Sequence, residues 1–241
     1  MNNEHFWPQW LIRKTKTKGV RFSQTKRVNP KSMKVPLCAA CNSAFGGELE
    51  DPMSRLLPQI ESGAGLSDLD AELLVHWMWK FEGLTWSFDH PELRYTERYT
   101  LRDRVLLPLD DIRADLTVAV SLIEVVTQGL ADEPMGLNSW TQASAIFGAG
   151  VFGRVAIMVL LTKFESEVPP AYSLYRFKDR NASDRGARLF FPKIGFANCT
   201  EAVKTSIAYG NWLSLCHDRD MRERIAEEAT PRYHQTLDSF D

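Results

Sequence analysis

Residues 4–11 read EHFWPQWL and residues 38–42 read CAACN, and these two stretches decide the fold predicted for the front of the chain. The first stretch places Glu4 beside His5, with Pro8 close behind. Adjacent residues of a β-strand point to opposite faces, so Glu4 and His5 can serve one site only at a strand end or in a turn. Pro8 favours such an ending, because proline is confined to the ends and edges of sheets.

These residue types suit the hydrolysis of a phosphodiester bond. That reaction needs a base to deprotonate water and a divalent cation to neutralise the charge that grows on the phosphate. His5 is the candidate base, because a neutral imidazole with an ordinary pKa of about 6.5 is mostly unprotonated at neutral pH. Glu4 offers the hard oxygen that Mg²⁺ or Mn²⁺ prefers.

The two stretches resemble the HNH, or ββα-metal, endonuclease family, and within it a divergent branch that reads EHxxPxWL and then CxxCNxxFGxxLE. The resemblance covers about the first fifth of the chain. It implies a metal-dependent endonuclease that acts on nucleic acid, with DNA as the expected substrate. It also implies that Glu4 and Asn42 hold the catalytic Mg²⁺ or Mn²⁺. A middle asparagine steadies the base in this family, and Asn29 is the candidate here, at a longer spacing than usual.

Two glutamates follow Asn42 on the expected helix. Glu48 lies six residues further on, about 600° of helix rotation, and so falls well off the face of Asn42. Glu50, eight residues on, returns near that face, so we predict it as a supporting metal ligand. The alternative is that these acids form an ordinary solvated helix surface.

The cysteine pair raises the question of a structural zinc ion. In the branch that this chain resembles, a second CxxC upstream of the EH pair often completes the zinc site. Cys38 and Cys41 alone cannot form a tetrahedral site, and Cys199 and Cys216 have a spacing unlike a knuckle. Either the zinc ion is absent or the chain lacks its natural N-terminus, and we favour the second explanation. A redox role for the pair is disfavoured, because no thioredoxin-like pattern surrounds it.

Basic residues gather between the two stretches. Residues 1–36 hold nine basic residues and one acid, whereas residues 37–70 hold six acids and one arginine. A nuclease needs positive charge beside its metal, so we expect this segment to contact a nucleic-acid backbone. The candidate contacts are Arg13, Lys14, Lys16, Lys18, Arg21, Lys26 and Arg27. The alternative is a solvated basic loop.

The whole chain predicts an α+β fold. We expect a small N-terminal ββα-metal (HNH) module over residues 1–60, followed by a mixed helix and antiparallel-sheet domain of unknown role over residues 68–241. Apolar spacing predicts a helix over 42–60 with a break near Pro52. It also predicts a helix over 71–82, capped by Asp68 or Asp70, with its apolar residues on one face.

Two motifs outside the front stretches are assigned no catalytic role. Residues 148–153 match the dinucleotide fingerprint GxGxxG, but residues 155–161 that follow predict a strand, so a β-hairpin explains the glycines better. A buried strand is also expected over 116–126. Asp89 and His90 repeat the acid-histidine pair, but no cysteine knuckle follows them.

The composition of the chain indicates which broad class of protein it belongs to. A chain of 241 residues with 44% hydrophobic content is globular rather than disordered. Few cysteines predict reduced thiols and a cytoplasmic location. The longest apolar run, residues 155–161, is too short to cross a membrane, so we expect no membrane partner. A homodimer stays open.

Two other classes of function also stay open. The first is a non-catalytic nucleic-acid-binding protein built on a degenerate HNH scaffold. The second is an interaction protein in which residues 68–241 are the active part.

Overall fold

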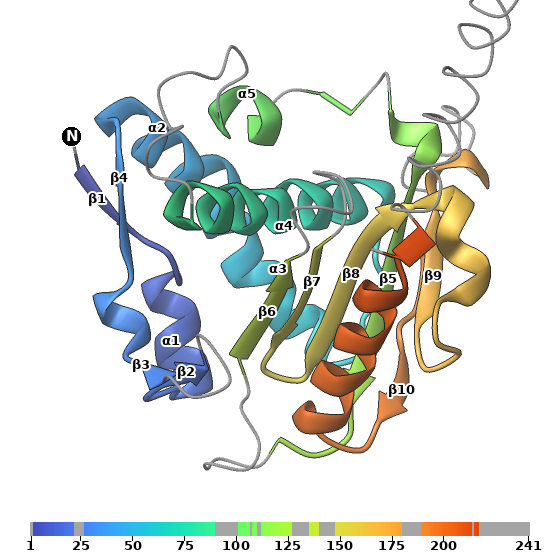
Figure 1. Cartoon of the computed structure of the whole chain (residues 1–241). Helices are drawn as coiled ribbons and strands as arrows, with labels where there is room; N and C mark the ends of the chain where they lie inside the picture. The colour runs from blue at the N-terminus through green and yellow to red at the C-terminus, as the bar shows by residue number, and fades with distance from the viewer. Residues whose placement is uncertain are drawn as a thin grey trace, which may run out of the picture.

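The computed structural model describes residues 2–21, 27–89, 101–106, 108–109, 112–126, 135–139, 148–179, 189–213 and 215–216. Within these ranges the chain mixes α-helices with β-sheets, as predicted (Figure 1). Also within them, no helix combines the length and the apolar character needed to cross a membrane.

The largest sheet runs in the order β10-β5-β8-β7-β6, and β9 also pairs with β5. Its strands are β5 (Leu116–Ile123), β6 (Met135–Ser139), β7 (Gly148–Phe152), β8 (Val155–Leu161), β9 (Ser173–Arg176) and β10 (Lys193–Phe196). The pairing of β10 with β5 is parallel, and the other pairings in this sheet are antiparallel. The sheet is therefore mostly antiparallel, as predicted.

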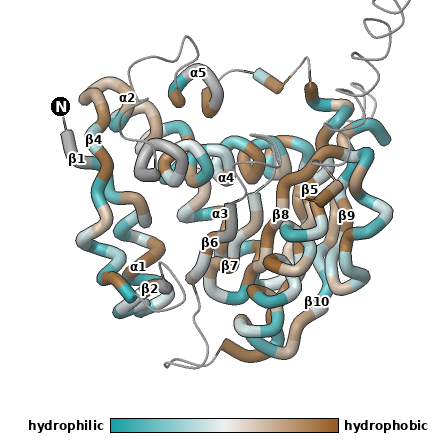
Figure 2. The backbone as a smooth tube through the Cα atoms, viewed as in Figure 1, coloured by the Kyte–Doolittle hydropathy of each residue, from teal (hydrophilic) through white to brown (hydrophobic). Residues whose placement is uncertain are grey.

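Helices cover both faces of this sheet. On β5, Val118 and Val120 belong to the core shared with α3 (Asp51–Glu61) and α4 (Asp68–Asp89). Ala119 and Ile123, which alternate with them, belong to a second core shared with a helix over residues 199–213. A strand buried on both faces needs apolar residues at every position, which is why β5 and β8 are hydrophobic along most of their length (Figure 2).

The glycine-bearing segment forms a β-hairpin, as predicted. β7 and β8 pair antiparallel from Gly148 to Val159, so no strand–turn–helix unit exists there to bind a dinucleotide. Gly153 sits in the turn with a φ of 66°, a left-handed conformation that favours glycine.

At the front of the chain two strands pair, and a helix follows the second of them. β1 (Asn2–His5) pairs antiparallel with β4 (Lys34–Leu37), and α2 (Ala39–Ala44) follows β4 directly. Between the two strands lie α1 (Gln9–Thr15), β2 (Val20–Arg21) and β3 (Arg27–Val28). The nuclease character of this unit stays a prediction.

The helix expected over 42–60 is present, but its irregularity lies elsewhere than predicted. A π-helix over Phe45–Glu50 joins α2 to α3 and contains both glycines of the segment. Pro52 sits in the first turn of α3, directly after this π-helix. The predicted break near Pro52 is therefore replaced by a π-helical turn just before it.

The helix predicted over 71–82 is longer and begins with a different cap. In α4 the backbone N–H of Ser67 donates to Asp70 Oδ2 at 2.8 Å, and the N–H of Asp70 donates back to Ser67 Oγ at 3.3 Å. This reciprocal pair is a capping box, so Ser67 is the cap where we expected Asp68 or Asp70. Asp68 is instead buried and accepts from Arg113 Nη2 at 2.8 Å.

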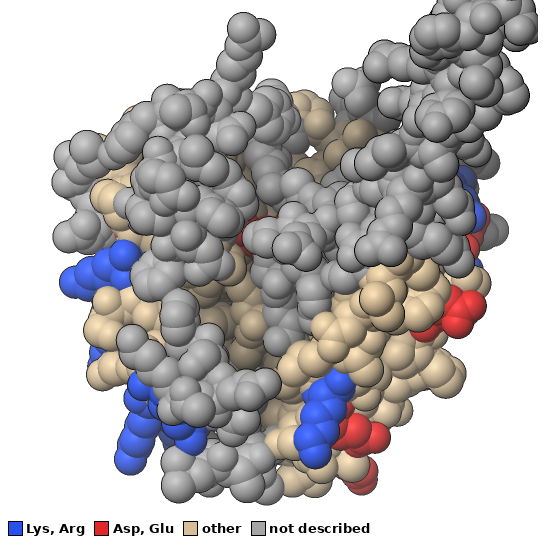
Figure 3. Space-filling view, in the orientation of Figure 1, with Lys and Arg blue, Asp and Glu red and all other residues tan. Residues whose placement is uncertain are grey.

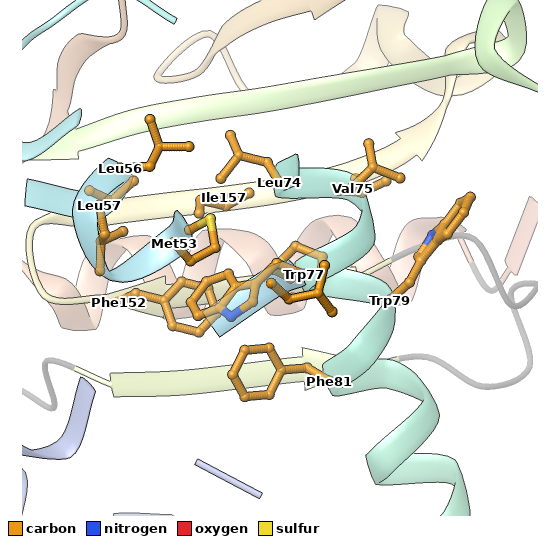
Figure 4. Packing of buried hydrophobic residues seen from close by; sticks show 14 of the residues in the cluster. Met53, Leu56, Leu57, Leu74, Val75, Trp77, Trp79, Phe81, Phe152 and Ile157 are labelled. Carbon is orange, nitrogen blue, oxygen red and sulfur yellow. The ribbon is translucent and has the colours of Figure 1, made fainter. Parts of the chain in front are cut away.

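The main core is continuous across the predicted domain boundary. Trp7 packs against Phe81 at 5.3 Å between ring centroids, and Trp77 packs against Phe152 at 4.5 Å. Figure 4 shows Trp77, Phe81 and Phe152 grouped with Met53 of α3. Side chains from both predicted domains thus share one hydrophobic cluster. Helix α5 (Leu101–Leu106) packs against α4.

Candidate functional site

The predicted site lies where β1 ends. His5 is the last residue of β1 and stands opposite Lys34, and Glu4 stands opposite Val35. Pro8 then precedes the first residue of α1. The strand end that Glu4 and His5 require to serve one site is therefore present.

A residue that we did not predict joins two of the proposed metal ligands. Lys80 Nζ, on α4, donates to Glu4 Oε1 at 2.9 Å and to Glu50 Oε1 at 2.7 Å. The Lys80 side chain is fully buried. The sequence did contain a hint, because a lysine between Trp77 and Phe81 lies within the apolar pattern of its helix.

Glu50 is fully engaged by donors. Besides Lys80, Trp10 Nε1 donates to Glu50 Oε2 at 2.8 Å and Trp77 Nε1 donates to Oε1 at 3.3 Å. Both carboxylate oxygens thus accept from buried or half-buried groups. These surroundings suit an anchor for the ammonium group better than a metal ligand.

The ammonium group of Lys80 is stabilised in its charged form. Burial lowers the pKa of Lys80, but the carboxylates of Glu50 and Glu4 outweigh it and raise that pKa above its ordinary value. The Phe45 ring lies 5.7 Å from Nζ and adds a cation–π contact. A buried charge is tolerated only with such partners.

Two other predicted residues carry unsatisfied buried atoms. Nδ1 of His5 and Oδ1 of Asn42 are buried and have no hydrogen-bond partner among the described residues. Asn42 lies on α2, which packs against β1. Buried polar atoms are normally paired, and an unpaired one costs about 1–3 kcal/mol. Two such atoms on adjoining elements mark a place that would accept a bound group.

A divalent cation fits part of the predicted set. Glu4 uses Oε1 for Lys80, which leaves Oε2 outside that ion pair, and Asn42 offers an unpaired carbonyl oxygen. Oxygen donors of this kind suit Mg²⁺ and Mn²⁺. Within the described ranges, no cluster of three or more His, Cys, Asp or Glu side chains is arranged to hold a metal ion. Glu4, His5 and Asn42 are the residues of the candidate site.

Asn29 has a local structural partner. Its side chain accepts from the backbone N–H of Lys31 at 3.0 Å and caps the 3-10 helix Pro30–Ser32. No hydrogen bond joins it to His5 Nδ1. The predicted role of Asn29 in steadying the base gains no support from this geometry.

The two cysteines of the knuckle are bonded to each other. Cys38 and Cys41 form a disulfide, where we expected thiols. Cys38 is also the cap of α2, and its Sγ accepts from the backbone N–H of Cys41 at 2.9 Å. Their predicted role as zinc ligands stays a prediction.

The predicted basic contacts lie on the surface. The exposed ones are Arg13, Lys14, Lys16, Lys18 and Arg27. Figure 3 shows Lys and Arg side chains at the lower left, over the region where Figure 1 draws α1, β2 and β3. Lys14 also pairs with Glu61 at 2.5 Å. The side chain of Arg21 and the whole of Lys26 lie outside the described residues, as does His90 of the second acid-histidine pair.

No protein-family model, curated protein or solved structure matches the chain.

Proposed function

We propose that this chain is a metal-dependent endonuclease of the HNH type, which hydrolyses phosphodiester bonds in nucleic acid, with DNA as the first substrate to test. One observation carries the proposal: His5 Nδ1 and Asn42 Oδ1 are both buried without partners, on β1 and on the α2 helix that packs against it. Unpaired buried atoms on residues that also match a nuclease motif are better explained by a site than by packing.

Each residue has a defined task in this proposal. Glu4 and Asn42 hold Mg²⁺ or Mn²⁺, which supplies positive charge to the phosphate and to the leaving oxygen. His5 accepts the proton of the attacking water on its imidazole ring. The exposed basic residues of α1 and the segment after it hold the nucleic-acid backbone.

A second candidate is a nucleic-acid-binding protein without catalysis. The observation that favours it is the ammonium group of Lys80, which already supplies a positive charge between Glu4 and Glu50. In that case binding persists in His5→Gln, falls as salt concentration rises, and the unmutated protein cuts nothing.

A supercoiled-plasmid nicking assay with Mg²⁺, Mn²⁺ or EDTA decides between the two. His5→Gln is compared with His76→Gln, since His76 also has a buried and unpartnered Nδ1 but lies on α4. Nicking that needs metal, is lost in His5→Gln and is kept in His76→Gln supports the endonuclease. Nicking that survives His5→Gln removes His5 as the base.

The zinc site is tested separately. A protein that starts at any earlier in-frame start codon is assayed for bound zinc and for nicking, beside the chain of 241 residues. Zinc that is bound by the longer protein and lost in Cys38→Ser would support the zinc-ligand role of the knuckle.

A further inference from the structure

Lys80 connects a rigid part of the molecule to a less constrained one. Its side chain is fully buried, whereas Glu4 is 18% exposed and is the penultimate residue of a four-residue strand. The two residues are 76 positions apart in sequence. The ion pair is therefore a tertiary contact that ties β1 to α4.

The rigid end is held from several directions. Glu50 fixes Lys80 Nζ at 2.7 Å and is itself held by the indole N–H groups of Trp10 and Trp77. The two indole rings are stacked with centroids 6.2 Å apart, and Trp77 is buried against Phe152. The position of Nζ is thus set by the core.

We infer that Lys80 is a positioning residue for Glu4: by holding Oε1, it turns the carboxylate so that Oε2 is presented to the divalent ion. This inference rests on the proposed function, in which Glu4 is a metal ligand. Removal of a group that orients a metal ligand in this way commonly weakens metal affinity about tenfold or more.

A purely electrostatic role for Lys80 makes the opposite prediction. A positive charge beside a metal ligand repels the metal, so its removal would tighten metal binding. Loss of a positioning contact would weaken metal binding, because Glu4 would then sample several orientations. Variants that keep the charge of the cluster should therefore leave Mn²⁺ affinity unchanged if the role of Lys80 is electrostatic, and should weaken it if Lys80 positions Glu4.

Two variants make the comparison. Lys80→Met/Glu50→Gln removes the ammonium group and one carboxylate, so the net charge of the cluster is unchanged and only the part-buried carboxylate of Glu4 loses its ion-pair partner. Lys80→Arg keeps the charge but moves the donors, because a guanidinium group is longer and planar. The matched control is Arg176→Met/Glu165→Gln, which removes a 2.7 Å ion pair at β9, across the molecule from β1 (Figure 1).

Mn²⁺ alone is titrated into each protein by calorimetry, and thermal unfolding shows which variants are folded. We expect Mn²⁺ binding about tenfold weaker, or more, in each folded Lys80 variant and unchanged in the control. Equal or tighter binding in a folded Lys80 variant overturns the positioning role while leaving the endonuclease intact. An unmutated protein that neither binds Mn²⁺ nor nicks DNA overturns both.

Discussion

Lys80 Nζ lies 2.7 Å from Glu50 Oε1, and the Lys80 side chain is fully buried while that of Glu50 is 10% exposed. The two residues are 30 positions apart and come from α4 and from the π-helix before α3. The contact joins the front of the chain to the central helix of the molecule, and its loss should affect folding as well as any chemistry at Glu4.

Lys80→Met is expected to lower the free energy of unfolding by about 3–5 kcal/mol, because it leaves two carboxylates without their shared cation. Urea denaturation measures the change. Lys178→Met is the comparison, since Lys178 pairs with Glu165 at 3.5 Å with 47% of its side chain exposed. Such an exposed pair contributes at most about 1 kcal/mol. Similar losses of unfolding free energy in the two variants would contradict the conclusion that the buried ion pairs of Lys80 stabilise the fold more than an exposed pair does.

Asn42→Ala is expected to leave the free energy of unfolding unchanged or slightly raised. The Asn42 carbonyl oxygen is buried without a partner, and alanine also has the higher helix propensity. The same variant should lose metal-dependent nicking, because Asn42 is proposed to hold the metal. Ser43→Ala, at an exposed neighbouring position, controls for effects on α2. A marked loss of stability in Asn42→Ala would identify Asn42 as a structural residue instead.

His76 should make stability fall on mild acidification. Burial lowers the pKa of His76, and the Glu72 carboxylate and a backbone hydrogen bond with Val105 only partly oppose this. Below about pH 6.5 the unfolded chain therefore binds a proton at His76 more readily than the folded one, so unfolding becomes easier as pH falls.

The measurement is the difference in unfolding free energy between the unmutated protein and His76→Gln from pH 8 to pH 5.5. We expect the unmutated protein to lose stability relative to the variant across that range, since glutamine does not titrate. A difference that stays constant with pH would show that His76 titrates alike in the folded and unfolded states.

Gly153→Ala should destabilise the β7–β8 hairpin by about 1–2 kcal/mol, because the φ of 66° at this position is unfavourable for a residue with a side chain. Thermal unfolding provides the comparison. Gly47→Ala is the contrasting change, since a Cβ there meets no atom within 4 Å and the residue is helical. Gly47→Ala should be neutral or stabilising.

Local features of the fold could be predicted from the sequence. The apolar runs of β5 and β8 and the hairpin glycine are each recorded in residues close together along the chain. The predicted single apolar face of α4 was wrong, because every residue from Trp77 to Leu84 is buried. The end of β1 at His5 could also be predicted from nearby residues, since Pro8 lies just beyond it. Periodicity and backbone restriction act over a few residues, so a short window is enough to recognise them.

The side-chain partners of the predicted site and cap residues depended on the tertiary fold. The sequence by itself predicted Glu4, His5, Asn42 and Glu50 as site residues. In the structure Glu50 accepts hydrogen bonds from two indole N–H groups and from the Lys80 ammonium group, which the sequence did not predict. Asp68, expected as a cap, is instead buried against Arg113 because α4 packs beside the segment that carries that arginine. Long-range ion pairs and unpaired buried atoms arise only when separate elements pack together, and for that reason the tertiary structure alone decided them.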